Sequence, residues 1–289
     1  MEKFVESSRA LEKIVSSIGD LPATPAIIAS LMNLTSDLNT DVNKITQALM
    51  SDQSLTARVL KLSNSSFYGR SKEVKTLKEA VILLGFKTLR SLVVASSTHS
   101  LYNATGGESH NKLWEHTLAT AISARLVAKA CRHPNIEEAF IAGLLHDIGK
   151  LVLLQKKPTE YIEIIVKAEV SGRTFIEFEE EKFGFNHTDV GLLLLHNWSF
   201  PHLLSNAVFE HHDPIEIDED CVPPLSFVIN VSNMVAKKLD VGFKDYRPEN
   251  LAEMKAAQRL NMNEEMFDQI IENLVEQFES ERKIFLSNG

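Results

Sequence analysis

The sequence lacks the features that define several large protein classes. It has only two cysteines, Cys131 and Cys221, which form no CxxC pair; two thiols are too few for a disulfide framework and argue against a zinc–thiolate site. No stretch reaches about 18 uninterrupted apolar residues, so we expect no membrane span. The N-terminus carries acids where a signal peptide needs a basic start, so we expect a cytoplasmic protein.

An excess of positive charge is also absent. The chain has 30 Lys and Arg against 39 Asp and Glu, a formal net charge of -9, which argues against a protein that coats DNA through its overall charge. One stretch, residues 58–90, is locally basic, and its members are Arg58, Lys61, Arg70, Lys72, Lys75, Lys78, Lys87 and Arg90. We interpret it as a solvated helix face, because no interleaved aromatic series suggests base stacking. Contact with an anionic ligand, a nucleic acid or an acidic partner is the alternative.

Helix signals dominate what is present. Thr76 with Glu79 and Thr174 with Glu177 form capping-box patterns, and the second helix should stop near Gly184. Strand-like alternation is scarce, and neither GxGxxG nor GxxxxGK occurs. The pattern predicts an all-α protein with roughly a dozen helices.

Two further helices are predicted in the second half of the chain. Asn135 with Glu138 starts a helix that should run through AFIAGLLHDIGKLVLL. Asn263 starts the last one, whose apolar residues follow a 3.6-residue period: Met266, Ile270, Leu274 and Phe278. This amphipathic helix should pack on the rest of the domain.

A polar, glycine-rich segment at 103–111 is the best internal break. We expect an N-terminal helical subdomain at residues 1–105 and a second subdomain at 106–289. Most of the ten histidines fall in the second one.

The pair His146–Asp147 is the centre of the histidine pattern. It lies within an apolar segment that we expect to be one helix, where an unpartnered His–Asp pair is costly to bury. A metal cation would offset both the desolvation and the carboxylate charge. Lys150 follows one turn later and could contact an anion beside the metal.

Other histidines extend the candidate site. His116 precedes the pair, His187 follows Asn186 at a helix start, and His211 and His212 end a helix. Ligands from four helices suit a divalent ion such as Fe or Mn better than a closed structural zinc site, with Zn the third candidate. The alternative is a hydrogen-bonded polar core that binds no metal. The histidines expected to have no ligand role are His99, His110, His133, His196 and His202.

The order His116, HDIGK at 146–150, NHTDVG at 186–191 and HH at 211–212 resembles the HD superfamily of metal-dependent phosphohydrolases. Three motifs of the N-terminal half resemble the HDOD (HD-related output domain) branch more than the HD-GYP branch: LPATP at 21–25, SDQSLTARVLKLSNSSFYGR at 51–70 and LKEAVILLGFKTLRSLVV at 77–94. The resemblance covers about residues 18–240.

This resemblance implies an HD-domain-like helical bundle with an N-terminal helical subdomain. HDOD proteins are regarded as signal-transduction modules, often without demonstrated catalysis, whereas HD-GYP proteins hydrolyse cyclic di-GMP. Lys150 matches the conserved lysine of HD-GYP enzymes. The residues that match their metal ligands are His116, His146, Asp147, His187, His211 and His212.

Three departures from the HD-GYP pattern weaken the case for catalysis. The final aspartate is replaced by Asn233, and a ligating glutamate one turn before the first histidine falls at Lys112. The sequence HHDPIEIDED stands in place of HHExxDGxGYP, which removes the loop that contacts substrate. A mononuclear or vestigial site is therefore expected rather than a multinuclear one.

We expect a regulatory module that binds a signalling protein or a small anionic ligand without turnover. The alternative is a metal-dependent phosphohydrolase of a nucleotide or cyclic dinucleotide, with Asp147 and Lys150 as its catalytic candidates. A nucleic-acid-binding regulator that acts through residues 58–90 is a third and more distant reading.

Overall fold

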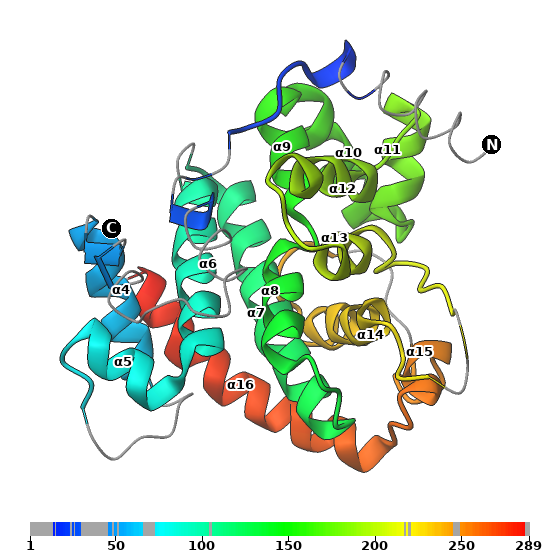
Figure 1. The fold of residues 1–289 in the computed structure, drawn as a ribbon. Helices are drawn as coiled ribbons and strands as arrows, with labels where there is room; N and C mark the ends of the chain where they lie inside the picture. The colour runs from blue at the N-terminus through cyan, green and yellow to red at the C-terminus, as the bar shows by residue number, and fades with distance from the viewer. Residues whose placement is uncertain are drawn as a thin grey trace.

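In the computed structural model the chain forms a helical assembly (Figure 1). The structure describes residues 52–65, 73–103, 106–216, 218, 221–244 and 249–286, and before residue 52 only positions 14, 16–23, 25, 27–29, 46, 47, 49 and 50. No strand occurs in these ranges, which confirms the predicted all-α class. The helices are α4 (Gln53–Ser63), α5 (Leu77–Leu84), α6 (Phe86–Asn103), α7 (Glu108–Ala130), α8 (Ile136–Leu145), α9 (Ile148–Lys156), α10 (Pro158–Ser171), α11 (Phe175–Phe183), α12 (His187–Asn197), α13 (His202–Phe209), α14 (Leu225–Lys238), α15 (Lys255–Arg259) and α16 (Glu264–Leu286).

Local capping signals fix several helix ends. Thr76 and Thr174 each close a complete capping box with the glutamate three residues later, which satisfies two amide groups at each helix start. Gly184 ends α11 in the left-handed conformation at φ 76°. Asn135 begins α8 as predicted, but its side chain makes no capping hydrogen bond.

The helix predicted through HDIGK is interrupted, so the expectation of one continuous helix is wrong. α8 ends at Leu145 and α9 begins at Ile148. After the break, α9 packs closely on α12: a Cβ atom at Gly149 would be 1.9 Å from the carbonyl oxygen of His187. Neighbouring side chains on a continuous helix diverge by about 100°, whereas the break lets His146 and Asp147 converge, with Nε2 to Oδ2 at 3.3 Å.

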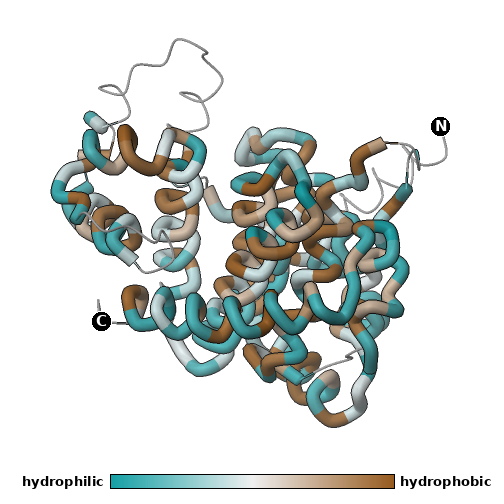
Figure 2. The backbone as a smooth tube through the Cα atoms, turned by 90° about the horizontal axis from the view of Figure 1, so that it is seen from below, coloured by the Kyte–Doolittle hydropathy of each residue, from teal (hydrophilic) through white to brown (hydrophobic). Residues whose placement is uncertain are grey.

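The long helix α7 is the centre of the packing. α6, α8, α14 and α16 all contact it, while α9 packs on α12 (Figure 1). Figure 2 shows α16 running across the molecule with hydrophobic and hydrophilic residues alternating around it. Of its predicted apolar stripe, Ile270, Leu274 and Phe278 are buried and Met266 is partly buried; Phe267 and Phe285, which the stripe did not include, are buried as well.

α16 packs against helices on both sides of the predicted boundary near residue 105. Phe285 lies 4.9 Å from the Trp114 ring and 4.8 Å from the His99 ring, centroid to centroid. It therefore joins α6 to α7 across the predicted boundary near residue 105, and the division at that boundary stays a prediction. Both tryptophans are in the core, and the Trp198 indole N–H donates to the carbonyl of Pro22 at 2.9 Å.

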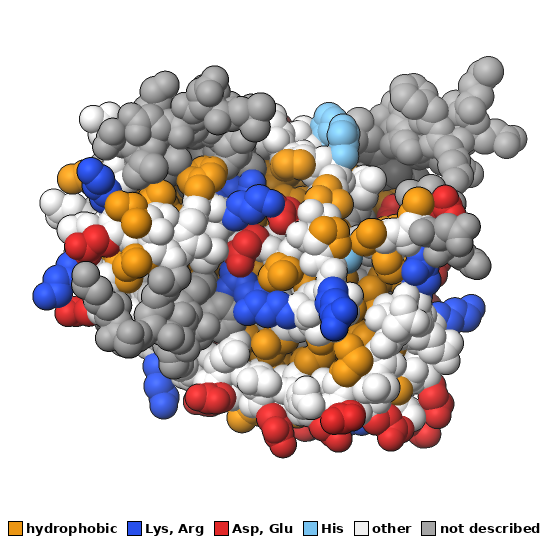
Figure 3. Space-filling model, turned by 60° about the horizontal axis from the view of Figure 1, so that its bottom comes forward, with side chains coloured by type: hydrophobic (Ala, Val, Ile, Leu, Met, Phe, Trp, Pro, Cys, Tyr) orange, Lys and Arg blue, Asp and Glu red, His pale blue; other side chains and the backbone are white. Residues whose placement is uncertain are grey.

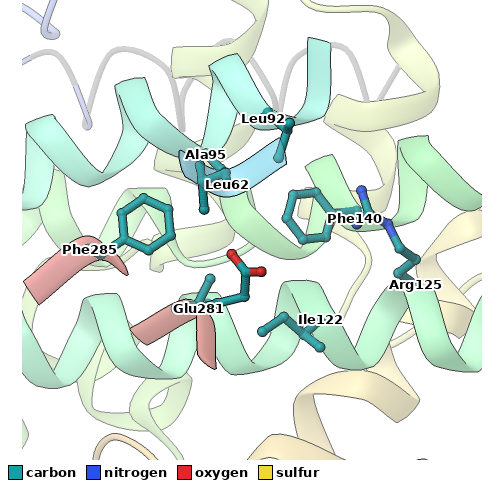
Figure 4. A pocket seen from close by; sticks show the side chains of 9 residues that line it. Leu62, Leu92, Ala95, Ile122, Arg125, Phe140, Glu281 and Phe285 are labelled. Carbon is teal, nitrogen blue, oxygen red and sulfur yellow. The ribbon is translucent and has the colours of Figure 1, made fainter. Parts of the chain in front are cut away.

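A buried carboxylate lies where α16 meets the N-terminal helices. Glu281 points into a cavity of about 10 Å³ among aliphatic and aromatic side chains of α4, α6, α7 and α8 (Figure 4). The Arg125 guanidinium on α7 also lines this cavity but pairs with Glu137 at 2.7 Å and lies 4.0 Å from the Phe140 ring centroid. Burial raises the pKa of Glu281 to about 7.

The described part of the basic stretch is interleaved with acids. Lys87 and Arg90 both pair with Glu138, at 3.8 and 2.8 Å, and Lys75 pairs with Glu73. On the face in Figure 3, basic side chains lie among hydrophobic ones in the middle, and acidic side chains gather along the lower edge. Lys75 and Lys87 are exposed, as the solvated-face interpretation expects, whereas Arg90 is mostly buried against Glu138. Arg70 and Lys72 lie outside the described residues. None of the helices in the described residues is long and apolar enough to cross a membrane.

Candidate metal centre

Four helical regions bring the predicted site residues together. α7 contributes one histidine, the break between α8 and α9 the His–Asp pair, the start of α12 another histidine, and the segment just after α13 the last two. They form two groups that share Asp147, each with ligand atoms within 4.8 Å of one another. The first group is Asp147, His187, His211 and His212, and the second is His116, His146 and Asp147.

Asp147 lies between the imidazole rings. Its Oδ2 atom is 3.3 Å from His146 Nε2 and 3.7 Å from His116 Nε2. Its Oδ1 atom is 3.4 Å from His187 Nε2 and 3.8 Å from His211 Nε2. Donors about 2.1 Å from one ion lie roughly 3 to 4 Å apart, so this spacing fits a shared cation.

On three of these rings, the nitrogen that points away from Asp147 donates a hydrogen bond to a backbone carbonyl. His146 Nδ1 donates to the Gly143 carbonyl and His211 Nδ1 to the Val208 carbonyl, at 2.8 and 2.6 Å. His116 Nδ1 donates to the carbonyl of Val241 at 3.2 Å. Because a carbonyl can only accept, these bonds fix the proton on Nδ1 and leave the Nε2 lone pair facing the carboxylate. Protein metal sites use this outer shell to orient their histidines.

His116 is also held by the loop after α14. Gly242 has φ 94°, and a Cβ atom there would lie 2.6 Å from the His116 Cβ. Glycine adopts this positive φ without strain. The loop backbone can therefore approach the ring closely enough to accept its proton.

Glu179 is a functional residue that the sequence reasoning missed. It is fully buried on α11 and accepts from His187 Nδ1 at 2.7 Å and from the His187 amide at 2.8 Å. The Tyr161 hydroxyl donates to its other oxygen at 2.6 Å. Burial raises the pKa of Glu179, but His187, Lys150 and Tyr161 outweigh it and hold that pKa below its usual value. The sequence signal that could have identified Glu179 is its spacing, because it lies on the same helix face as Phe175.

The inward-facing atoms of the centre have no hydrogen-bond partner. They are the Nε2 atoms of His116, His146 and His211 and the Oδ1 atom of Asp147, all buried. An unsatisfied buried polar atom costs about 1–3 kcal/mol, and lone pairs that face one another repel. A divalent cation held by either group would satisfy the unpartnered atoms of that group, so the residues present fit a metal.

The protonation states also suit metal binding. Burial lowers the pKa of His116 to about 3 and holds the pKa values of His211 and His212 well below the usual range. For Asp147, burial acts to raise the pKa, but His146, Lys150 and His187 together hold it well below its usual value. The His116–Asp147 contact is therefore a neutral ring beside a carboxylate and not an ion pair. Neutral imidazoles and an ionised carboxylate are the forms that ligate metals.

His212 adds a second contact to His187. Its Nε2 atom is 3.1 Å from His187 Nε2, and its ring is half-buried rather than fully buried. Since His187 carries its proton on Nδ1, the two Nε2 atoms face each other with one proton or one cation between them. Asn230 on α14 fixes this corner by donating to the carbonyl of His211 at 2.8 Å.

Lys150 contacts the centre through Asp147. Its ammonium donates to Asp147 Oδ2 at 2.9 Å and lies 4.6 Å from the Phe175 ring centroid. The cavity beside these two residues measures about 10 Å³, roughly one water. The proposed contact of Lys150 with an anion, and the catalytic and ligand roles of the other site residues, stay predictions.

The departures from the HD-GYP pattern have distinct surroundings. Lys112 is half-exposed and pairs with Glu108 at 3.3 Å, and it belongs to neither metal group. Asn233 is buried on α14, and neither of its amide atoms has a hydrogen-bond partner. In the segment HHDPIEIDED, Glu216 pairs with Arg259 of α15.

Two of the histidines set aside as non-ligands have structural partners. The His99 Nε2 atom lies 2.8 Å from the Asn103 amide nitrogen, and its ring packs on Trp114. His133 Nε2 donates to the Pro223 carbonyl at 3.1 Å. Neither belongs to a metal group in the part of the chain that the structure describes.

A larger cavity opens beside the centre. It measures about 320 Å³ and shares Lys237 with the small cavity near Asp147. Lys237 is 3% exposed, and the sequence reasoning missed it. The lining residues are Thr174, Ile176, His212, Asn230, Met234, Lys237 and Met254.

Fold and site together define an all-helical protein with a buried His/Asp centre suited to a divalent metal. The profile of the HDOD domain family matches residues 21–214, two thirds of the chain. The chain therefore belongs to the HDOD domain family, as the resemblance predicted.

Relatives and solved structures agree with this assignment. An uncharacterized protein of Treponema pallidum (strain Nichols) is 24% identical over 242 residues, which are 83% of this chain and 47% of that protein. The chain spans about half the length of the curated relatives it matches. An HDOD domain protein of unknown function from Geobacter sulfurreducens has a TM-score of 0.84 at 24% identity, with 97% of this chain and 98% of that one covered.

A second solved structure has a similar fold. A candidate phosphohydrolase from Shewanella amazonensis SB2B has a TM-score of 0.73 at 24% identity, with 96% of this chain and 98% of that chain covered. At these identities the likeness concerns the fold alone.

Proposed function

We propose that this protein is a cytoplasmic regulatory HDOD module whose His/Asp centre holds one divalent metal ion and which binds a small anionic ligand or a signalling protein without turnover. The ring of unpartnered Nε2 atoms around Asp147 carries the proposal. Such a set of donors is stable when a cation completes it. Iron, manganese and zinc all remain candidates for the ion.

The lack of further anionic ligands at the centre and the small size of the cavity beside it support the absence of turnover. Asn233 supplies no anionic ligand, and Lys112 is paired with acids away from the centre. The cavity beside Asp147 and Lys150 has room for about one water and not for a phosphodiester. A bound metal would polarise an oxygen atom that coordinates it. The protein residues would orient the ligand that carries this oxygen.

A metal-dependent phosphohydrolase is the second candidate. The 320 Å³ cavity that reaches His212 favours it, as does the name of the Shewanella neighbour. In that case Asp147 would orient the nucleophile and Lys150 would neutralise phosphate charge. The two candidates differ in one observable, which is turnover.

Elemental analysis of protein purified without chelator tests the proposal. We expect about one equivalent of Fe, Mn or Zn in the wild type and none in the His146→Ala/Asp147→Ala double variant. The matched control is His196→Ala, because His196 is an exposed histidine on α12. Wild-type protein that takes up no metal, or a double variant that retains it, would contradict the metal centre.

Turnover is measured on the same metal-loaded protein. We expect no release of product from a panel of phosphodiesters and nucleotides. Metal-dependent release that the double variant lacks would replace the regulatory proposal with the phosphohydrolase.

A further inference from the structure

Helix α10 carries an exposed apolar stripe. The helix packs on α9 and α11 at one edge of the molecule (Figure 1), and its other face is turned to solvent. Three hydrophobic side chains lie on that outer face, Ile162, Val166 and Val170, and they are 48%, 55% and 84% exposed. These three residues form the α10 stripe. Val170 is the most exposed large hydrophobic side chain among the described residues.

The α10 stripe is a continuous surface and not a set of scattered side chains. Its members are spaced i, i+4 and i+8, so they lie on successive turns of one helix face. Single exposed hydrophobic residues are common on soluble proteins, whereas contiguous ones mark interaction surfaces. Valine and isoleucine are also poorer helix formers than the polar residues usual at exposed positions. The stripe therefore contributes little to the monomer, which indicates that it contacts something else.

Two opposite charges flank the α10 stripe on one side. Glu163 and Lys167 are exposed and lie one turn apart, each directly after a stripe residue in the sequence. Glu163 also pairs with Lys182 of α11 at 3.6 Å, and both of these side chains are about half exposed. An exposed ion pair of this kind contributes little, so Glu163 stays accessible to a second lysine. A negative and a positive charge one turn apart form a pattern that complements its own reverse.

A two-fold axis at the level of Ile165 brings charges and stripe into register together. Antiparallel copies of α10 would place Glu163 of each copy level with Lys167 of the other, because both residues lie two positions from Ile165. The stripe residues lie three positions before, one position after and five positions after that level. Since each residue rises about 1.5 Å along the axis, the six side chains would alternate between the two copies. One arrangement therefore pairs opposite charges and interleaves the apolar side chains.

We propose that the outer face of α10 docks a second copy of this chain, with the two α10 helices antiparallel in a symmetric dimer. Two-fold dimers are the commonest assemblies of soluble proteins, and their interfaces match one surface with itself. An unrelated partner would use the apolar stripe but would not require flanking charges that complement their own reverse. The contact is one helix long, so the dimer is weak and reversible. It is independent of the metal centre, because none of these residues belongs to either metal group.

Sedimentation equilibrium of the full chain tests the proposal. We expect the weight-average mass to rise from one chain toward two between about 10 µM and about 1 mM protein, the range in which a small interface associates. A wild type that stays monomeric over this whole range overturns the proposal and leaves the stripe to a different protein.

Reversal of the flanking charges tests the two-fold arrangement. Glu163→Lys alone and Lys167→Glu alone should each weaken the dimer about tenfold or more, because like charges would meet at two symmetric contacts. The double swap Glu163→Lys/Lys167→Glu restores both contacts and should bring the affinity within about threefold of the wild type. Glu279→Lys, at an exposed glutamate on α16, controls for the added charge. Single reversals that dimerise like the wild type, or a double swap no tighter than the single ones, would refute the arrangement.

A charge at the centre of the α10 stripe tests the apolar contact. Val166→Arg brings two arginines together beside the axis and should abolish dimerisation. Val275→Arg, at an α16 valine that is 48% exposed, is the matched control and should dimerise like the wild type. Both valines are exposed, so we expect both variants to keep the melting curve of the wild-type monomer. A dimer that survives Val166→Arg would lie on another surface and would overturn the proposal.

Discussion

Asp147 is shared by both groups of candidate ligands, and each of its oxygens faces two imidazole nitrogens. Its burial is tolerated because Lys150 donates to it and the surrounding rings lower its pKa. The chemistry of the centre therefore depends on the groups that orient the rings as much as on the ligands themselves. Glu179 orients His187 directly, and Gly149 allows the close approach of α9 to the His187 backbone.

Glu179→Gln tests the orienting role of the carboxylate behind His187. The variant keeps the size of the side chain but removes the charge that accepts the His187 Nδ1 proton. Loss of such an outer-shell partner lowers metal affinity by about 10- to 100-fold. Competition with a chromophoric chelator measures it. Glu181→Gln, at an exposed glutamate on the same helix that pairs with Arg173, is the control, and equal affinities in the two variants would refute the role.

Gly149→Ala tests the close approach of α9 to α12. The added Cβ would meet the backbone carbonyl of His187 at 1.9 Å, so backbone must move, and we expect a loss of about 3 kcal/mol in the free energy of unfolding. Gly191→Ala is the matched comparison, because the nearest atom to its Cβ would belong to the Val208 side chain, at 3.0 Å, and the nearest backbone atom would be 3.9 Å away. Urea unfolding measures both, and a similar loss in the two variants would contradict the backbone contact.

Among the elements, α16 packs on both α7 and α4, as α6 also does. Most of its inward face is apolar, but Glu281 replaces an apolar residue at the point where it meets α7 (Figure 4). The charged group that faces Glu281 from α7 is Arg125, which already pairs with Glu137. Ser65, after α4, and the charge of Arg125 act to lower its pKa, but less than burial raises it.

Glu281 should make stability depend on pH. Its pKa is about 7 in the folded protein and 4.5 is the ordinary value, so between these the folded state binds more protons than the unfolded state. Stability from this group is therefore complete below about pH 4.5 and is lost as pH rises to about 7, a change on the order of 3 kcal/mol.

Glu281→Gln should remove this dependence. Its free energy of unfolding should exceed that of the wild type at pH 8 and approach it at pH 5, as urea unfolding at both values would show. Glu279→Gln, at an exposed site on the same helix, should follow the wild type. A Glu281→Gln curve parallel to the wild type between pH 5 and 8 would rule out the buried carboxylate as the cause.

At the scale of the whole molecule, the metal centre joins four parts of the chain that are far apart in sequence. The ligand candidates come from α7, the α8–α9 break, α12 and the segment just after α13. A metal that binds only this folded arrangement stabilises all of it at once. Metal binding and global stability should therefore be linked.

Metal loading should raise the melting temperature. At a free metal concentration about 100 times the dissociation constant the gain is about 2.7 kcal/mol, which for a chain of this size corresponds to roughly 5 to 10 °C. Differential scanning fluorimetry with and without chelator measures it. The His146→Ala/Asp147→Ala variant should show no shift, and a shift as large as that of the wild type would mean that the metal binds elsewhere.

The sequence alone determined the fold class, the family and the helix ends with local caps. Thr76 and Thr174 contact residues three positions away, so the local sequence is enough to predict where these two helices begin. The order of the histidines and His146–Asp147 along the chain carried the family resemblance. The ligand candidates therefore follow from the order of residue types along the chain.

The tertiary structure alone decided what depends on contacts between distant residues. The helix breaks at His146–Asp147, and Gly149 just after the break meets the carbonyl of His187, which lies 38 positions later in the chain. The sequence reasoning identified neither Glu179 nor Lys237, and the packing of α11 and α14 buries them beside the centre. Burial is a property of the assembled helices, because the free energy of a charged side chain depends on which neighbours replace its water.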